Sequence, residues 1–228
     1  MKNIIIIGIP SKGRLKENSI NFLEKDNLKL TSKGGDRNYF ASFSSLPNVQ
    51  IVYLHAREII ERLGDGTLDF GISGLDLLEE SPKNLQKKIE KLKKLDFGVA
   101  DLVVAVPDDW IDVQTVADLE EIAFKFKDKK KKRLRVATKY PNLTREFLFS
   151  KGVTQFKLVS SLGATEVYPF TGSSEIITDI TSSGETLRAN NLRILKDGEI
   201  LKSEACMMAS KSSLKNSLVK KLVKLLSK

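Results

Sequence analysis

The organisation of this chain follows from residues 166–188, EVYPFTGSSEIITDITSSGETLR. Within them, the β-branched run 176–180 predicts a buried strand, the small polar residues 181–184 predict a tight loop, and residues 186–187 predict the start of a helix. The N–H groups of such a loop have no partner in a strand or helix, and a helix N-terminus carries partial positive charge. This arrangement is typical of a site that binds a phosphate monoester.

Further polar side chains gather around this predicted loop. Additional hydrogen-bond donors come from the hydroxyls of Thr181, Ser182, Ser183 and Thr186. Glu166 and Asp179 are negatively charged and cannot bind a phosphate, but they suit the vicinal hydroxyls of a ribose. The combination predicts a pocket for a ribose 5-phosphate. An ordinary turn followed by a helix N-cap explains the same residues and stays open as the alternative.

The composition is that of an ordinary soluble globular protein, with 228 residues, 41% hydrophobic and 7% aromatic. This length suits one large or two small domains. The net charge of +9 favours anionic partners, which include nucleic acid, anionic membranes and polyphosphate metabolites. Much of the charge lies in residues 125–135 and 215–228, which we interpret as solvated surface.

The chain has a single cysteine, Cys206, and a single histidine, His55. These counts exclude a disulfide framework, a thiolate metal cluster and a histidine-based triad or zinc site. The apolar run 4–9 is too short for a signal sequence, so we interpret it as the first buried strand of a cytoplasmic protein. No segment approaches the roughly 20 apolar residues that span a bilayer, and we expect no membrane partner.

A second set of polar residues follows the early strands. Strands 4–9, 49–54 and 69–72 alternate with helices, which predicts parallel crossovers whose connecting loops meet at one sheet edge. The residues that we expect to line a crevice at this edge are Lys12, Gly13, Arg14, Ser73, Gly74 and Asp76. A surface turn in which Gly13 provides backbone freedom stays open as the alternative for the first loop.

The remaining elements complete two runs of alternating strands and helices. We expect helix 56–63 to end at Gly64, helix 119–126 to precede the basic run, and residues 212–226 to form an amphipathic terminal helix. The pair Asp197-Gly198 predicts a hairpin between strands 192–195 and 200–208. The predicted fold is α/β with two lobes and a cleft between them. Lobe I comprises residues 1–97 and 204–228, and lobe II comprises residues 98–203.

The motif and several further blocks of the chain resemble a known family. The spacing of Glu166, Gly172, Ser174, Asp179, Ser183, Gly184 and Thr186 is similar to the phosphoribosyl-diphosphate motif of ATP phosphoribosyltransferases. Further blocks that agree are PSKGRLKE (10–17), GGDRNYF (34–40), DFGISGLDLLEE (69–80), DFGVADLVVAVP (96–107), RVATKYPNLTREF (135–147) and TLRANNLRILKDGEILKSEAC (186–206). The resemblance covers nearly the whole chain. It implies a periplasmic-binding-protein-like fold of type II and, with the chain stopping at Lys228, the short form without a C-terminal regulatory domain.

The resemblance also implies a reaction, the first step of histidine biosynthesis. N1 of the adenine of ATP displaces diphosphate from C1 of phosphoribosyl diphosphate, with Mg²⁺ held through substrate phosphates. The implied partners are a regulatory subunit resembling histidyl-tRNA synthetase and further copies of the chain, as a homodimer or larger assembly.

Site roles follow by resemblance. Phosphoribosyl diphosphate would be bound by Glu166, Asp179, Thr181, Ser182, Ser183, Gly184, Glu185 and Thr186. ATP and diphosphate would be bound by Lys12, Gly13, Arg14, Arg57, Ser73, Gly74 and Asp76. Arg37 and Asp179 would act in catalysis. Two positions depart from the pattern, since Glu175 replaces an aspartate and His55 replaces an arginine that many members carry.

Two other function classes stay open beside this interpretation. A non-catalytic protein that binds small anions would share the two-lobed fold. Nucleic-acid binding would use the positive charge, but no aromatic residues interleave the lysines of residues 127–133 to form a base-stacking platform. We therefore expect no nucleic-acid partner.

Overall fold

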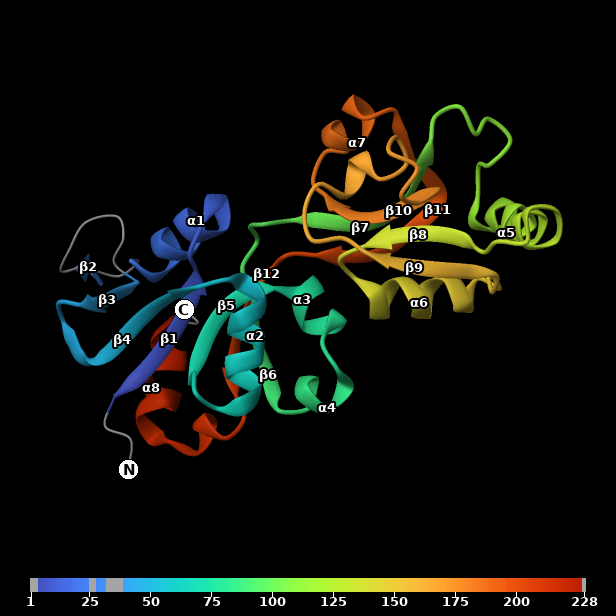
Figure 1. The fold of residues 1–228 in the computed structure, drawn as a ribbon. Helices are drawn as coiled ribbons and strands as arrows, with labels where there is room; N and C mark the ends of the chain where they lie inside the picture. The colour runs from blue at the N-terminus through green and yellow to red at the C-terminus, as the bar shows by residue number, and fades with distance from the viewer. Residues whose placement is uncertain (1–3, 25–27, 32–38, 227–228) are drawn as a thin grey trace. The chain divides into compact units, whose positions relative to one another are not determined.

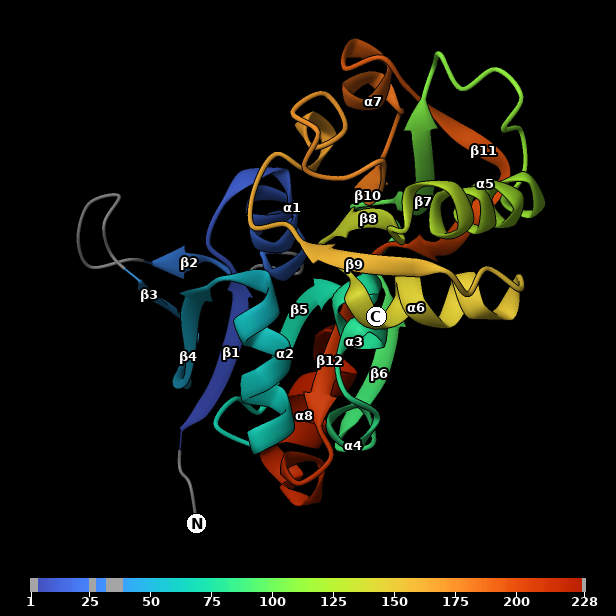
Figure 2. The same cartoon turned by 45° about the vertical axis from the view of Figure 1, so that its right-hand side comes forward.

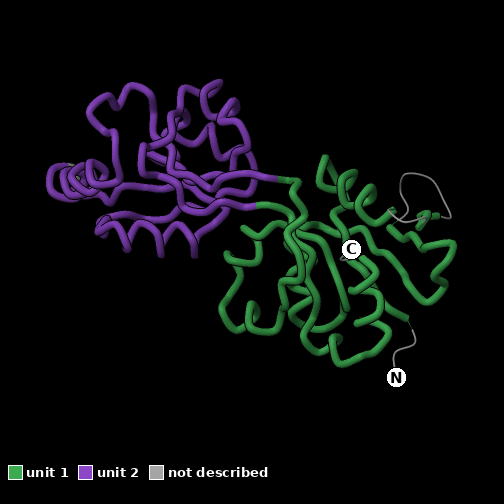
Figure 3. Tube along the Cα trace, turned by 180° about the vertical axis from the view of Figure 1, so that it is seen from behind, with its two compact units in different colours: residues 1–98, 204–228 green, residues 99–203 purple. Residues whose placement is uncertain are grey.

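The computed structural model describes residues 4–24, 28–31 and 39–226. The chain has a mixed α/β fold and divides into two compact units, residues 1–98 with 204–228 and residues 99–203 (Figure 3). The polypeptide therefore passes between the units twice, after Gly98 and after Ser203. The predicted lobes differ from these units at residue 98.

Among its described residues, unit 1 contains a seven-stranded sheet in the order β2-β3-β4-β1-β5-β12-β6 (Figure 1). Its strands are β1 (Ile5–Pro10), β2 (Leu30–Thr31), β3 (Phe40–Phe43), β4 (Leu46–Leu54), β5 (Phe70–Gly74), β6 (Ile89–Lys94) and β12 (Ala205–Ser210). Its helices are α1 (Gly13–Leu23), α2 (Ala56–Asp65), α3 (Leu75–Glu80), α4 (Lys83–Gln86) and α8 (Ser217–Leu226), with the 3₁₀ turn η2 (Ser213–Lys215). β1 is parallel to both β4 and β5, as the crossover pattern predicts.

Both faces of this sheet are covered, which explains the unbroken apolar run in β1. Ile5, Ile7 and Ile9 face a core that includes residues of α1 and α8. The opposite face packs against α2, and a Cβ on Gly71 of β5 would lie only 2.7 Å from Cγ2 of Ile59 in that helix. Glycine therefore allows α2 to lie close to the centre of the sheet.

Unit 2, described throughout residues 99–203, contains a five-stranded sheet in the order β11-β7-β10-β8-β9. Its elements are β7 (Ala100–Pro107), α5 (Val116–Lys130), β8 (Leu134–Thr138), α6 (Pro141–Ser150), β9 (Phe156–Ser160), η1 (Thr165–Val167), β10 (Ile176–Thr181), α7 (Glu185–Ala189) and β11 (Leu192–Ser203). β8, β9 and β10 are parallel, and β7 is antiparallel to β10. Figure 2 shows α6 and α7 on opposite sides of this sheet.

The predicted hairpin around Asp197-Gly198 is wrong. β11 is one continuous strand that pairs with β7, and register shifts absorb the extra residues as bulges. Gly198 is buried, and a Cβ there would lie 3.1 Å from the carbonyl oxygen of Val104. Asp197 Oδ1 accepts a hydrogen bond from the Val116 N–H at 2.8 Å and so satisfies the start of α5. Both residues of the turn-like pair thus contact residues that are remote in sequence, Asp197 through Val116 and Gly198 through Val104.

Two predicted helix ends are also wrong. α2 continues past Gly64 to end before Gly66, whose φ of +81° fits a left-handed cap. Gly64 instead makes room for Leu85, whose Cγ would lie 2.6 Å from a Cβ at this position. α5 extends through the first part of the basic run to Lys130.

No helix among the described residues has the length and apolarity to cross a bilayer.

Candidate active site

The predicted phosphate loop connects β10 to α7 at the carboxyl end of the strand. Thr181 Oγ1 accepts a hydrogen bond from the Gly184 N–H at 2.8 Å, and Gly184 has a φ of +71° that favours glycine. The intervening Ser182 and Ser183 are exposed, as are Glu185 and Thr186 beyond them. α7 has only five residues, so its dipole adds little positive charge at the loop. An anion at this site would therefore be bound mainly by the N–H and hydroxyl groups of the loop.

The two predicted ribose-binding acids lie close enough to influence each other. Asp179 is 8% exposed near the end of β10, whereas Glu166, in η1, is half-buried. Burial raises the pKa of the Asp179 carboxyl, and the negative charge of Glu166 raises that pKa further. Lys139 and hydrogen bonds from the Ile180 N–H and Thr165 hydroxyl lower the same pKa. The Asp179 carboxyl is thus a hydrogen-bond acceptor that is largely removed from water and lies beside the positive charge of Lys139.

A buried group of hydroxyls fixes the sheet beneath these acids. Thr178 Oγ1 lies 2.6 Å from Thr138 Oγ1 and 2.6 Å from Thr144 Oγ1. The Tyr140 N–H donates to Thr138 Oγ1 at 2.8 Å. The network joins β8, α6 and β10 directly behind Asp179, and satisfied buried networks of this kind hold a structure rigidly.

In unit 1, three loops meet at the carboxyl edge of the sheet, as predicted. Ser11, directly after β1, donates its N–H to the Leu54 carbonyl at the end of β4 at 2.8 Å. Ser73 Oγ donates to the Ala56 carbonyl at 2.8 Å, which joins β5 to α2. These bonds bring together the loops that follow β1, β4 and β5.

The predicted nucleotide-side residues differ in exposure. Lys12, Gly13 and Arg14 are exposed at the start of α1, where Gly13 has a φ of +68° and open space around it. Ser73 and Asp76 are buried. Asp76 lies against Gly74, because a Cβ on Gly74 would collide with the Asp76 carboxylate. The exposed cations are therefore placed to meet an anion, while the buried pair shapes the loop.

His55 has a structural role at the start of α2. His55 is the N-cap of α2, and its Nδ1 accepts a hydrogen bond from the Arg57 N–H at 3.3 Å. The Arg57 side chain is exposed at this same sheet edge. The predicted catalytic residue Arg37 lies outside the described residues.

Comparison with known proteins identifies the family. The family profile described as ATP phosphoribosyltransferase matches residues 55–228. A curated relative from Mesorhizobium japonicum, named ATP phosphoribosyltransferase, is 46% identical over 211 residues, covering 92% of this chain and 91% of the relative. The chain belongs to the ATP phosphoribosyltransferase family. The predicted family and enzyme class, a pentosyltransferase, are thereby confirmed.

Members of the ATP phosphoribosyltransferase family that resemble this chain differ in length. The chain spans 66% of a relative from Rhodopseudomonas palustris and 64% of one from Bradyrhizobium diazoefficiens, at 46% and 45% identity. These matches cover 93% and 91% of this chain. The matched portions thus span most of this chain.

Solved structures agree with the predicted fold class. An ATP phosphoribosyl transferase HisG:HisZ complex from Thermotoga maritima matches with a TM-score of 0.75 at 24% identity, covering 98% of this chain and 96% of the solved chain. The arginine-, lysine-, histidine-binding protein ArtJ of Geobacillus stearothermophilus matches with a TM-score of 0.54 at 11% identity, covering 98% and 89%. The periplasmic-binding-protein-like α/β fold is thereby confirmed, and the cleft between lobes stays a prediction.

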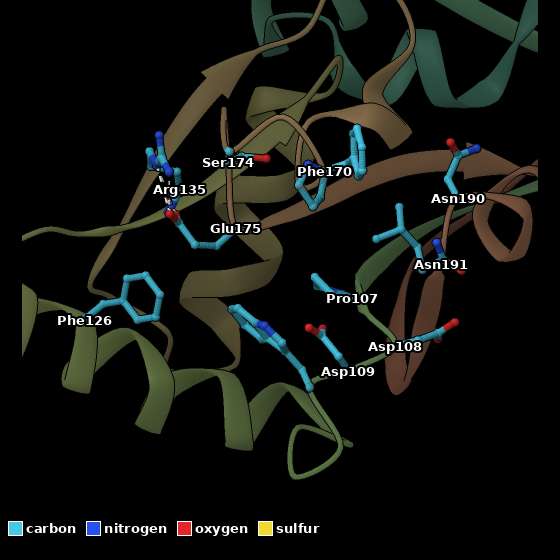
Figure 4. Close-up of a pocket in the computed structure, with 14 residues that line it drawn as sticks. Pro107, Asp108, Asp109, Phe126, Arg135, Phe170, Ser174, Glu175, Asn190 and Asn191 are labelled. Carbon is cyan, nitrogen blue, oxygen red and sulfur yellow. Dashed lines mark hydrogen bonds and ion pairs between the residues drawn. The ribbon is translucent and has the colours of Figure 1, made fainter.

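The position that departs from the ATP phosphoribosyltransferase motif, Glu175, lies away from the phosphate loop. Glu175 lines a cavity of about 680 Å³, together with Trp110, Phe126 and Arg135. Figure 4 shows Glu175 beside Arg135 in this cavity. Glu175 precedes β10, whereas Asp179 lies near the end of that strand, so the cavity is at the opposite edge of the sheet. Glu175 is held there by Arg135.

Sequence reasoning missed two neighbours of Asp179. Lys139 Nζ lies 3.8 Å from Asp179 Oδ1, and Thr165 hydrogen-bonds to the same carboxylate. The signal for Lys139 was present, because Lys139 lies within the block 135–147 that resembles the family, directly after the strand that forms β8. Carboxyl ends of parallel strands meet at one sheet edge, so the residue after that strand lies near Asp179.

Proposed function

We propose that this chain transfers the phosphoribosyl group of phosphoribosyl diphosphate to N1 of ATP, the first step of histidine biosynthesis. The observation that carries the proposal is the pairing of Asp179 and Glu166 beside the exposed hydroxyl loop 181–186 in a member of this family. The acids suit the ribose hydroxyls, and the loop donors suit the 5-phosphate.

The reaction requires no general base to create the nucleophile, because N1 of adenine carries an in-ring lone pair. The N1–C1 bond forms as the bond from C1 to the diphosphate oxygen breaks, and the electron pair leaves with diphosphate. The protein then contributes mainly by positioning the reactants and by stabilising charge. His55, whose Nδ1 accepts a helix-capping hydrogen bond, needs no role as a proton carrier in this scheme.

Magnesium is the proposed cofactor. No cluster of three or more histidine, cysteine, aspartate or glutamate residues within 4–24, 28–31 and 39–226 could hold a metal ion. Mg²⁺ commonly binds through substrate phosphates and water with few protein ligands, and the polyphosphate substrates here supply such oxygens. When bound, it neutralises charge on the departing diphosphate.

The nucleotide and diphosphate are assigned to unit 1. Lys12 and Arg14 are exposed after β1, and Arg57 is exposed near the start of α2. Their positive charges suit the polyphosphate groups. Gly74 and Asp76 would shape the nucleotide side, Ser73 would support their loop, and Arg37 would act on the diphosphate.

Assembly with other chains forms part of the proposal. The similar solved structure from Thermotoga maritima is a HisG:HisZ complex, which supports a regulatory partner for this chain. We infer that this partner is a subunit resembling histidyl-tRNA synthetase, that the chain forms a homodimer or larger assembly, and that it works in the cytoplasm. Light scattering of the chain, alone and mixed with such a subunit, tests the assembly.

An ultraviolet assay of phosphoribosyl-ATP formation tests the reaction. The purified chain is incubated with ATP, phosphoribosyl diphosphate and Mg²⁺. Pyrophosphatase is added to hydrolyse diphosphate, the inhibitory product. Product formation by the chain alone supports both the reaction and activity without a partner. If the chain is silent, the assay is repeated with the synthetase-like subunit. Failure there, with phosphoribosyl diphosphate still binding, would favour a non-catalytic anion-binding protein.

A substitution tests the site. Asp179→Ala should lower turnover by about a hundredfold or more, since it removes a group that contacts the reacting sugar. Asp128→Ala is the matched control, because Asp128 is an exposed residue of α5 whose carboxylate lies 4.0 Å from the ammonium group of Lys131. Circular dichroism checks that both variants fold. Unchanged transfer by folded Asp179→Ala would refute this assignment of the site.

A further inference from the structure

One cation lies beside the proposed ribose-binding acid and comes from a different strand. Lys139 directly follows β8, and its Nζ lies 3.8 Å from Asp179 Oδ1. The Asp179 side chain is 11% exposed, whereas that of Lys139 is 36% exposed. The lysine therefore remains in contact with solvent while its charge faces a carboxylate that is largely removed from water.

The backbone on both sides of this pair is fixed. Thr138, the last residue of β8, pairs with Thr178 of β10 in parallel register, so the residues that follow them, Lys139 and Asp179, lie abreast. The Thr138 and Thr178 hydroxyls are hydrogen-bonded to each other at 2.6 Å. The Tyr140 N–H, on the far side of Lys139, also bonds to Thr138. The backbone that carries Lys139 is thus fixed by buried structure, within reach of the Asp179 carboxylate.

The other charged groups around Asp179 cannot replace this cation. Glu166 of η1 is negative and opposes ionisation of Asp179. On β7 the residue paired with Asp179 is Val103, and the charged Asp101 is paired with Thr181. Beyond the loop, Glu185 is negative, and Arg188 donates to the Ser183 carbonyl.

We propose that Lys139 is a positioning residue that keeps Asp179 ionised and oriented to accept hydrogen bonds from the ribose of phosphoribosyl diphosphate. This role rests on the proposed function. A neutral Asp179 would be a weaker acceptor, because a carboxylate offers two full acceptor oxygens whereas the acid uses one oxygen to carry its proton. Lys139 acts through Asp179 and needs no contact with the substrate.

The first test needs no substrate. The ¹³Cγ signal of Asp179, assigned with Asp179→Asn, is titrated by NMR in the wild type and in Lys139→Met, Lys139→Arg and Lys157→Met. Lys157 is an exposed lysine of β9 and serves as the matched control. The midpoint should move to higher pH in Lys139→Met and stay in place in the other two variants. An unmoved midpoint in Lys139→Met overturns the proposal, and Lys139→Gln gives the same test if the methionine variant does not fold.

The second test measures kinetics against pH. In Lys139→Met, kcat/KM for phosphoribosyl diphosphate should fall about tenfold at the acid limb, since a charge-assisted contact is lost. The KM for ATP should not change, and Lys139→Arg should restore the profile. A loss of stability without movement of the acid limb would show a structural role only and overturn the proposal. Because the NMR titration requires no turnover, failure of the proposed function is recognised separately, by a silent wild-type enzyme.

Discussion

Arg135 and Glu175 hold the beginnings of β8 and β10 together through contacts of both side chain and backbone. Arg135 Nη2 lies 2.6 Å from Glu175 Oε1, and the Arg135 N–H donates to Glu175 Oε2 at 2.7 Å. Both oxygens of the carboxylate are therefore engaged within the protein. The acid that departs from the family motif is a structural link at the sheet edge opposite the phosphate loop.

Glu175→Ala should consequently affect stability rather than catalysis. The change leaves the Arg135 N–H without its acceptor, and we expect a loss of about 1 to 3 kcal/mol in the free energy of unfolding. Urea unfolding measures this loss, and kcat/KM should stay within about twofold of the wild type. Glu121→Ala is the control, because Glu121 forms an exposed i,i+4 pair with Lys125 that contributes little. A large fall in turnover at unchanged stability would show that Glu175 acts on the substrate.

Asp179→Asn should separate stability from activity. Burial raises the pKa of Asp179, so the folded state holds this proton more tightly than the unfolded chain does. The associated stability is present at low pH and is lost as the pH rises through the pKa of the folded state. The variant should therefore have a higher Tm than the wild type at pH 7, and the difference should shrink on acidification, while turnover falls about a hundredfold. A lower Tm at pH 7 would contradict the assignment of a destabilising buried charge.

Local sequence pattern was sufficient where neighbours along the chain determine the structure. The β-branched run 176–180, followed by small residues and Gly184, correctly predicted β10, the loop and the start of α7. The same reasoning failed at Asp197-Gly198, because the partners of that pair, Val116 and Val104, are remote in sequence. An Asp-Gly pair that forms a turn and an Asp-Gly pair in a bulge that is stabilised by residues of other elements have the same local sequence.

The candidate site shows the same division. Asp179 and the loop residues were predicted from one continuous segment, whereas Lys139 lies 40 residues earlier and meets Asp179 only through the register of β8 and β10. Glu175 is four residues from Asp179 in the sequence, yet it precedes β10 and so lies at the other end of that strand from the loop. Strand direction, rather than proximity in sequence, separates these residues.

Gly184→Ala should weaken binding of phosphoribosyl diphosphate. Gly184 has a φ of +71°, which disfavours a side chain by about 1 kcal/mol, and relaxation of that strain would disturb the N–H bond to Thr181. The KM for phosphoribosyl diphosphate should rise about tenfold, equivalent to one lost hydrogen bond. Gly152→Ala is closely matched, with a φ of +84° and a flexible carboxylate 2.9 Å from its Cβ position. Equal changes in KM for both variants would show that the loop has no special role.

Gly74→Ala tests the nucleotide side in unit 1. The added methyl group would collide with the Asp76 carboxylate, and Asp76 is 6% exposed in the first turn of α3. The side chain or the loop has to move, so the KM for ATP should rise about tenfold while that for phosphoribosyl diphosphate changes little. Gly163→Ala is the control, because a Cβ at Gly163 has no neighbour within 4 Å. If Gly74→Ala instead raised only the KM for phosphoribosyl diphosphate, the assignment of ATP to this sheet edge would be wrong, because the displaced carboxylate would be acting on the sugar.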